Sequence, residues 1–335
     1  MAILVTGGAG YIGSHMVRML ASTGQNVIVV DSLEYGHPEA LPPEAKLVVG
    51  NVGDVKLLED VFSRNPIESV IHFASYISVP ESVSEPEKYF QNNLISPLKL
   101  LQTMVNHSVK NIIFSSTAAV YGTPQDVPIP ETHPKSPINP YGLSKLGFEQ
   151  TLAYFDRQFN LKSIALRYFN ACGASSDGKF GEDHHPEGHL IPLVISAALS
   201  NSQATINGND YSTKDGTCIR DYIHIEDLCS AHLLALDALK NGHSTDVFNV
   251  GTGTGHSNLE VVNTIKEASG IDFSVTYGPR RQGDPDELVA DSTKLQKRLG
   301  WQPRWSDLLT IVSHALSWHK SHPNGYSNHP NPQPQ

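Results

Sequence analysis

A tyrosine and a lysine four residues apart, Tyr141 and Lys145, carry the strongest chemical signal in this sequence. Residues at this spacing share one face of a helix, so the sequence predicts that the Lys145 ammonium lies close to the Tyr141 phenol. A free tyrosine has a pKa of about 10, and a neighbouring cation favours the phenolate and lowers that pKa. The pair therefore predicts a general base that removes a hydroxyl proton. Alone, such a pair more often marks an ordinary helix face, so its meaning depends on the residues around it.

Glycines crowd the turn that follows the first apolar run. Residues 1–5 are typical of a buried strand, and helical spacing of apolar residues begins at Tyr11. Between them, Gly7, Gly10 and Gly13 have the spacing of a dinucleotide fingerprint, in which a pyrophosphate lies against the N–H groups of a helix start. A nicotinamide cofactor together with an activated tyrosine predicts oxidation of a carbinol and the reverse reaction.

An acidic residue ends the second apolar run. Residues 26–30 lead into Asp31, which lies 18 residues after Gly13. A carboxylate at this place can bond the adenosine ribose hydroxyls and would repel a 2′-phosphate. The sequence therefore predicts NAD rather than NADP. The alternative is a glycine-rich turn in an unrelated α/β protein.

Strand-like runs alternate with helical stretches through the first half of the chain. The runs are residues 2–5, 26–30, 46–49, 70–73, 112–115 and 163–166. This alternation predicts an α/β fold with a Rossmann-type, doubly wound parallel sheet. Glycines, histidines and prolines cluster from about Cys172 onward, which predicts a smaller C-terminal substrate-binding lobe. We expect an NAD-binding domain over 1–171, a mainly substrate-binding lobe over 172–320 with segments such as 247–251 returning to the main sheet, and a flexible tail over 321–335.

The composition excludes several classes of function. The formal net charge of −10 offers no basic surface for nucleic acid. No apolar run approaches the roughly 18 residues of a membrane span. The chain passes directly into its first strand, without a basic region or a cleavage site, so we expect no secretory signal. Three cysteines without a C-x-x-C pair predict a reduced, cytoplasmic setting.

Three histidines close together raise the question of a metal site. His184, His185 and His189 share one segment, but Pro186 and Gly188 make it a loop. No H-E-x-x-H motif or cysteine partner accompanies them. The sequence therefore predicts no metal, and a solvated or substrate-side loop instead.

Sequence blocks spread over nearly the whole chain make it resemble the UDP-glucose 4-epimerases, a family of extended short-chain dehydrogenase/reductases. The blocks are VTGG at 5–8, IHFA at 71–74, FSSTAAVYG at 114–122, LRYFN at 166–170, RDYIH at 220–224 and PRRQGD at 279–284. The resemblance implies interconversion of UDP-glucose and UDP-galactose by oxidation at C4, rotation of the 4-keto sugar and re-reduction, with NAD bound throughout. It also implies a homodimer.

The resemblance implies a role for individual residues. In catalysis, Tyr141 takes the proton of the 4-hydroxyl, Lys145 holds the phenolate and the nicotinamide ribose, and Thr117 bonds the 4-oxygen. The expected cofactor-binding residues are Gly7, Gly10, Tyr11, Ile12, Gly13, Asp31, Ser32, Asn51, Val52, Phe73, Ala74, Ser75, Asn92, Ser115, Tyr141, Lys145 and Phe169. The expected substrate-binding residues are Thr117, Tyr141, Asn170, His189, Leu190, Arg220, Arg281 and Asp284, with the two arginines on the uridine diphosphate.

Four positions depart from the family pattern. Asn51 replaces a common aspartate near the adenine and can still bond to it. Ile77 stands where some members have a lysine near the pyrophosphate, which implies weaker binding of NAD. His189 replaces an asparagine that touches the substrate. Leu288 stands where a bulky tyrosine tends to exclude N-acetyl sugars, which implies a roomier pocket and some turnover of UDP-N-acetylglucosamine.

Other functions remain open. An epimerase of a UDP-N-acetylhexosamine or a UDP-pentose would share the same core residues. A sugar-nucleotide dehydratase needs an acid beside the threonine, whereas this chain has Ala118 and Ala119. A non-catalytic dinucleotide sensor would keep the glycine turn but would not need Thr117, Tyr141 and Lys145 together.

Overall fold

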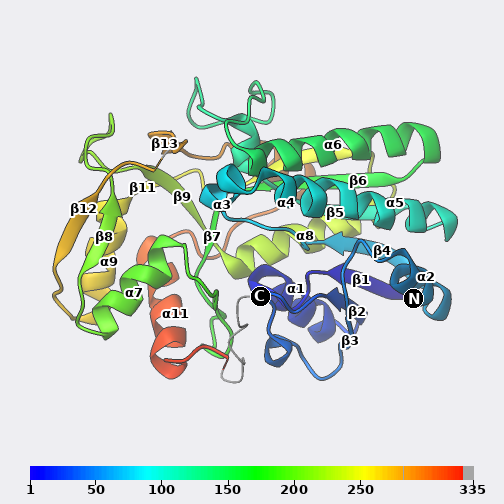
Figure 1. Ribbon diagram of the computed structural model, residues 1–335, viewed down its shortest axis with the longest axis horizontal. Coiled ribbons are helices and arrows are strands. Elements are labelled where there is room, and N and C mark those ends of the chain that lie inside the picture. The colour runs from blue at the N-terminus through cyan, green and yellow to red at the C-terminus, as the bar shows by residue number, and fades with distance from the viewer. Residues whose placement is uncertain (282, 327–335) are drawn as a thin grey trace.

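The computed structural model describes residues 1–281 and 283–326 and is built on a seven-stranded sheet (Figure 1). The strands are β1 (Ala2–Thr6), β2 (Asn26–Asp31), β3 (Lys46–Val49), β4 (Ile67–His72), β5 (Asn111–Thr117), β6 (Lys162–Tyr168) and β10 (Asp246–Val250). They are parallel throughout, in the order β10-β6-β5-β4-β1-β2-β3. The predicted doubly wound parallel sheet is thus confirmed. β10 pairs with β6, so the segment expected to return to the main sheet does so.

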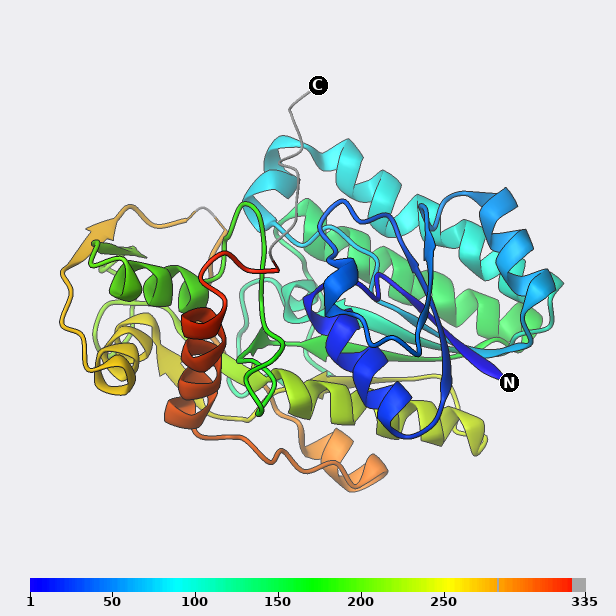
Figure 2. The same ribbon diagram turned by 90° about the horizontal axis from the view of Figure 1, so that it is seen from below.

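Helices cover both faces of this sheet. They are α1 (Tyr11–Ser22), α2 (Val55–Arg64), α5 (Ser96–Asn106), α6 (Pro140–Phe159) and α8 (Ile225–Lys240), with the shorter α3 (Val79–Ser84) and α4 (Pro86–Phe90) beyond β4. Ile3 and Val5 of β1 pack on one side with α1 and α8, which lie next to each other in Figure 2. Ala2 and Leu4 pack on the other side with α2, α5 and α6. Burial of both faces explains why the strand is an uninterrupted apolar run.

The first lobe takes part of its core from late in the sequence. Leu228 and Leu236 of α8 share a core with Ile113 of β5. Trp301 follows α10 (Thr293–Leu299), is fully buried in that core, and donates its indole N–H to the Asp227 carbonyl at 3.1 Å. The two lobes therefore exchange segments of chain and are not divided at a single point.

The second lobe has its own apolar core, formed mainly by three helices. They are α7 (Leu190–Leu199), α9 (Asn258–Ser269) and α11 (Leu308–Ser321). Its strands are β7 (Asn170–Cys172), β9 (Ile219–His224), β11 (Gly255–Ser257) and β13 (Glu287–Leu288) in one sheet, and β8 (Ala204–Asn207) with β12 (Val275–Gly278) in another. β9 pairs with β7, β11 and β13, and so carries its residues through the centre of the lobe.

The last described residue, Tyr326, packs against the body of the protein. Its N–H donates to Asp183 Oδ2 at 2.8 Å, and its ring centroid lies 4.8 Å from that of Trp318. Residues 327–335 of the predicted tail lie outside the described residues. Among the helices of the described ranges, none combines the length and the apolar character needed to cross a membrane.

Candidate active site

A cavity of about 810 Å³ opens where the main-sheet strands end, between that sheet and the second lobe. Every residue predicted to bind the cofactor lines it, as do the three predicted catalytic residues. All the predicted substrate-binding residues also line it except Leu190, which packs against the core of the second lobe at the start of α7. The structure thus brings residues from the whole length of the chain to one cavity.

The glycine turn between β1 and α1 fits a dinucleotide pyrophosphate. Gly7 has φ +70°, and a Cβ there would lie 2.5 Å from the Ala74 nitrogen. A Cβ at Gly13 would overlap the Gly7 carbonyl, so the helix can approach the strand only with glycine there. A Cβ at Gly10 would meet only the Gly7 oxygen, at 3.6 Å, and this residue lies on the cavity wall. Gly10 is also the N-cap of α1 and makes no side-chain capping bond, which leaves helix N–H groups available to an anion.

Asp31 is held rigidly at the end of β2. Its Oδ2 accepts from the Ala9 N–H and its Oδ1 from the Leu33 N–H, both at 2.9 Å. Burial raises the pKa of the carboxyl, and these backbone bonds oppose that rise. Each carboxylate oxygen accepts more than one hydrogen bond, so Asp31 retains the capacity to bind ribose hydroxyls.

The start of α6 positions the candidate base. Asn139 is the N-cap, and its side-chain oxygen accepts from the Gly142 N–H at 2.8 Å. Pro140 follows at the first helical position, where its fixed φ suits the helix. Tyr141 therefore lies in the first turn, and Lys145 lies one turn later on the same side. Thr117 faces them from the end of β5, close enough to the Tyr141 phenol for its hydroxyl to favour the phenolate.

The expected lowering of the Tyr141 pKa is wrong for this structure. Lys145 Nζ donates to Ser75 Oγ at 2.7 Å and to the Ser115 carbonyl at 2.8 Å, and lies 5.9 Å from the centroid of the Tyr141 ring. Burial raises the pKa of Tyr141, and the Thr117 hydroxyl opposes that rise only in part. Burial also lowers the pKa of Lys145 to about 7. Desolvation, which spacing in a sequence does not reveal, dominates both groups.

A buried ion pair that was not predicted from the sequence fixes α6 to the sheet. Arg167 of β6 bonds Glu149 of α6 through Nη2–Oε2 at 2.6 Å and Nε–Oε1 at 2.9 Å. Ser116 Oγ donates to the same carboxylate at 2.5 Å, and Arg167 Nη1 donates to Tyr121 Oη at 2.8 Å. The available signal was an arginine inside an apolar strand and a glutamate one turn after Lys145. This network fixes the position of α6, the helix that carries both Tyr141 and Lys145, against the sheet.

Two arginines reach the far end of the cavity from the second lobe. Arg220 of β9 is buried, donates to the Ile219 carbonyl at 2.9 Å, and has Nη2 at 3.8 Å from Asp284 Oδ1. Arg281 faces Asn207, whose amide oxygen, turned toward it, accepts from Nε at 2.8 Å and Nη2 at 3.1 Å. Guanidinium groups held in this way suit phosphate oxygens.

Leu288 lines the same end of the cavity. It pairs with Arg220 in the register of β13 and β9, and its side chain packs on a small core that includes Phe169.

Two aromatic residues missing from the predicted set close the cofactor end of the cavity. Tyr76 donates its phenol to Glu34 Oε2 at 2.8 Å, and its ring meets that of Tyr35 edge to face at 6.0 Å. All three residues line the cavity, as does Ile77, the site of the missing lysine. The signal for them was a pair of tyrosines shortly after the second and fourth strands.

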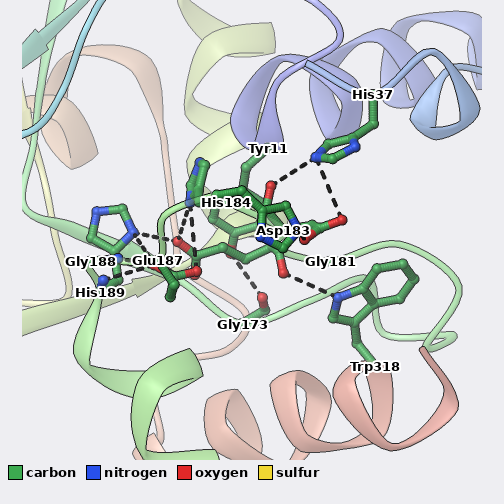
Figure 3. A network of polar contacts seen from close by, with 12 residues as sticks. Tyr11, His37, Gly173, Gly181, Asp183, His184, Glu187, Gly188, His189 and Trp318 are labelled. Carbon is green, nitrogen blue, oxygen red and sulfur yellow. Dashed lines mark hydrogen bonds and ion pairs between the residues drawn. The ribbon is translucent and has the colours of Figure 1, made fainter. Parts of the chain in front are cut away.

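The loop before α7 also forms part of the wall. His184, Glu187 and His189 line the cavity, and Figure 3 shows how closely their side chains gather. His189 Nδ1 lies 2.5 Å from Glu182 Oε1; burial lowers the pKa of His189, but the carboxylates of Glu182 and Glu187 outweigh it and raise that pKa to about 9. The loop thus lies on the cavity wall, and its predicted place on the substrate side stays a prediction.

Comparisons with known proteins agree with this arrangement. Residues 3–251 match the NAD dependent epimerase/dehydratase family. A UDP-glucose 4-epimerase of Lactobacillus helveticus is 50% identical over 327 residues, covering 97% of this chain and 99% of that protein. A crystal structure of a UDP-glucose 4-epimerase superposes with a TM-score of 0.95 at 45% identity, covering 98% of this chain and 100% of that one. The Bifidobacterium longum UDP-glucose 4-epimerase in complex with NAD⁺ and UDP has a TM-score of 0.91 at 40% identity, with 97% and 100% covered.

Proposed function

The chain belongs to the NAD dependent epimerase/dehydratase family, and we propose that it interconverts UDP-glucose and UDP-galactose at C4 of the sugar. One observation carries the proposal: a single cavity joins the glycine turn and Asp31 at one end to Arg220 and Arg281 at the other, with Tyr141 between them. A hydroxyl group bound at the centre is therefore within reach of both a base and a cofactor.

The cofactor is NAD. The start of α1 receives the pyrophosphate, Asp31 the adenosine ribose, and Lys145 the nicotinamide ribose. When bound, NAD⁺ supplies an acceptor for the C4 hydride and returns that hydride to the opposite face of the sugar. Asp31 disfavours the 2′-phosphate of NADP by charge and by the backbone bonds that fix its position.

Tyr141 moves the proton. Its Oη takes the proton of the 4-hydroxyl as the sugar is oxidised and gives it back as the 4-keto group is reduced. Thr117 is placed to bond the 4-oxygen, since it already reaches the Tyr141 phenol. Lys145 holds this end of the cavity through Ser75 and Ser115, and its charge stabilises the phenolate that forms during turnover.

Arg220 and Arg281 hold the diphosphate while the 4-keto sugar rotates. A fixed diphosphate with a free glycosidic linkage lets the sugar present either face to the same base. His189 and Asn170 face the sugar side, and Asp284 orients Arg220. Leu288 forms the wall that limits the size of the sugar.

Rival activities have less support. In the structure Ala118 and Ala119 follow Thr117 on the cavity wall, where a dehydratase would need an acid. A dinucleotide sensor has no use for a base beside Thr117. Epimerisation of UDP-N-acetylhexosamine or UDP-pentose remains the alternative, because it requires the same residues.

We further infer a homodimer in the cytoplasm, as expected from the family resemblance. The three cysteines, Cys172, Cys218 and Cys229, are free and buried, as suits a reduced compartment.

The test is direct. Purified protein is given UDP-galactose, UDP-N-acetylgalactosamine and UDP-arabinose in separate reactions, and product epimers are resolved by chromatography. We expect UDP-glucose as the main product from UDP-galactose, with no net consumption of NAD. If UDP-galactose gives no UDP-glucose, the proposed activity is wrong. If UDP-N-acetylgalactosamine or UDP-arabinose reacts faster than UDP-galactose, the preferred substrate is that sugar nucleotide instead.

A further inference from the structure

Two glutamates and two histidines converge on the wall of the cavity just before α7. Glu182, His184, Glu187 and His189 each direct one possible ligand atom to the same point, and these atoms all lie within 4.8 Å of one another. The histidines alone, in a loop without a recognised motif, predicted no metal. Nothing in the sequence indicates that the loop turns both carboxylates inward to meet them.

The distances suit tetrahedral coordination. Zinc binds imidazole nitrogen and carboxylate oxygen at about 2.0–2.2 Å, so the ligand atoms of a tetrahedron lie roughly 3.3–3.6 Å apart. His184 Nδ1 is 3.2 Å from Glu182 Oε1 and 3.8 Å from Glu187 Oε2. His189 Nδ1 is 3.6 Å from Glu187 Oε1 and 2.5 Å from Glu182 Oε1. To surround one ion, the last separation must widen, and the other ligand atoms, which lie within 4.8 Å of one another, must shift to tetrahedral distances.

Charge and hydrogen bonding both favour a cation at this point. The cluster holds two carboxylates, and the Glu182 side chain is only 4% exposed. A buried carboxylate of this kind requires a compensating positive charge, which protonated His189 supplies here and which a bound cation would supply on displacing that proton. Within residues 1–281 and 283–326, the buried His184 Nδ1 has no partner with hydrogen-bond geometry, although it lies 3.2 Å from Glu182 Oε1 and 3.8 Å from Glu187 Oε2.

The second ligand histidine is open to solvent. The His189 side chain is 44% exposed, which gives an ion a path of entry.

We propose that Glu182, His184, Glu187 and His189 bind one divalent zinc-class cation, which braces the wall of the cavity. Two imidazoles with two carboxylates suit Zn²⁺ among the common divalent ions. Four protein ligands complete the tetrahedron, so the ion has a structural role and leaves no open position for catalysis.

The proposed ion connects three parts of the wall. His189 is the N-cap of α7, and Glu187 Oε1 accepts the N–H groups of Gly188 and His189 at 2.7 and 2.8 Å. The His184 ring meets the ring of Tyr11, the first residue of α1, edge to face at 6.3 Å. An ion at this point therefore fixes the loop 182–189 between the start of α7 and the glycine turn.

Metal binding to untagged protein tests the proposal. The protein is treated with a chelator, dialysed, and titrated with Zn²⁺ by calorimetry and with Co²⁺ by visible absorption. We expect one ion per chain, a Co²⁺ spectrum of tetrahedral type, and a melting temperature that rises with Zn²⁺. Absence of Zn²⁺ binding, or an octahedral Co²⁺ spectrum, would overturn the proposal, because a cluster of ion pairs with protonated imidazoles predicts no tetrahedral site.

Matched variants locate the site. His184→Ala and His189→Ala should each lower the affinity for Zn²⁺ by at least about 100-fold, the upper end of what loss of an outer-shell partner costs. His185→Ala is the control, because His185 belongs to the same loop but is 72% exposed and lies outside the cluster. Circular dichroism without metal establishes that each variant is folded. Wild-type affinity in both folded variants would assign the binding to other histidines and refute the proposal.

Discussion

The Lys145 ammonium lies 5.9 Å from the centre of the Tyr141 ring and donates its hydrogen bonds to Ser75 and Ser115 instead. Tyr141 thus shares a helix face with a cation without being directly bonded to it. Burial raises the pKa of the phenol and lowers that of the ammonium, so both groups are held toward their neutral forms. Tyr141 can take the substrate proton only as the phenolate, so the phenol must lose its own proton first, and the nearby Lys145 cation stabilises that phenolate until the transfer neutralises it.

Replacing Tyr141 by Phe should lower turnover by at least about 10²-fold, the lower range for general acid–base catalysis. The ring and its packing remain, and only the ionisable oxygen is lost. Steady-state rates with UDP-galactose measure the effect. Tyr154→Phe is the control, since Tyr154 lies on the same helix and is 66% exposed. Near wild-type turnover in Tyr141→Phe would exclude this residue as the base.

Lys145→Met keeps the length of the side chain and removes its charge. We expect lower turnover and a pH–rate profile displaced to higher pH, because the phenolate loses its nearest stabilising cation. The pH dependence of kcat is the measurement. If kcat falls but its pH dependence does not move, Lys145 acts only by binding the cofactor and does not stabilise the phenolate.

Asp31→Ala should narrow the preference for NAD over NADP. The substitution removes the negative charge that opposes a 2′-phosphate and the acceptors for the ribose hydroxyls. Dissociation constants for both dinucleotides measure this preference, with Asp272→Ala as the control, because the Asp272 side chain is 93% exposed. Comparable affinity for NAD and NADP in the wild type would contradict the role given to Asp31.

Leu288→Tyr should suppress turnover of UDP-N-acetylglucosamine more than that of UDP-glucose. Leu288 lies on the cavity wall beside Arg220, so added bulk there meets the larger sugar first. Misfit in a pocket typically costs about 1–3 kcal/mol, so the ratio of kcat/KM values should change by roughly 10–200-fold. An equal fall in both reactions, or no N-acetyl turnover in the wild type, would show that Leu288 does not select the sugar.

Acid should weaken folding through His232. It is buried in its neutral form, with Nδ1 2.8 Å from the Leu228 carbonyl and Nε2 2.5 Å from the Tyr168 phenol. Burial lowers its pKa to about 4, from the ordinary 6.5 that the unfolded chain restores. Between these values the unfolded state binds more protons, so the free energy of unfolding falls as pH drops from 6.5 toward 4, by up to about 1.4 kcal/mol per pH unit.

Urea unfolding at several pH values measures this effect. His232→Gln should be less stable than wild type at pH 7, and that deficit should shrink toward pH 4. His185→Gln, on an exposed loop position, should show no such convergence. A deficit independent of pH would mean that His232 stays neutral in the unfolded chain or is charged in the folded one.

The main sheet was predictable because its strands are buried on both faces and so appear as apolar runs, as β1 and β2 do. The glycine turn was predictable because Gly7 and Gly13 meet steric demands that other residues cannot. The cluster of Glu182 with His189 was not predictable, because a loop has no periodic pattern to indicate which of its side chains turn inward. The partners of Lys145 were also hidden, since Ser75 follows strand β4 and Ser115 lies on β5, and both reach α6 only in the folded chain.

α8 covers a face of the sheet whose strands come earlier in the sequence. During synthesis on the ribosome, that apolar face therefore stays uncovered until α8 has been made. β1 to β6 emerge before Ile225, the first residue of α8, so Ile113 and Ile164 have no cover from that helix until it follows. At about 5–20 residues per second, translation of the intervening segment takes several seconds. During that time the nascent chain presents an apolar sheet surface of the kind that chaperones bind, and a ribosome stalled before α8 would release a fragment prone to aggregate.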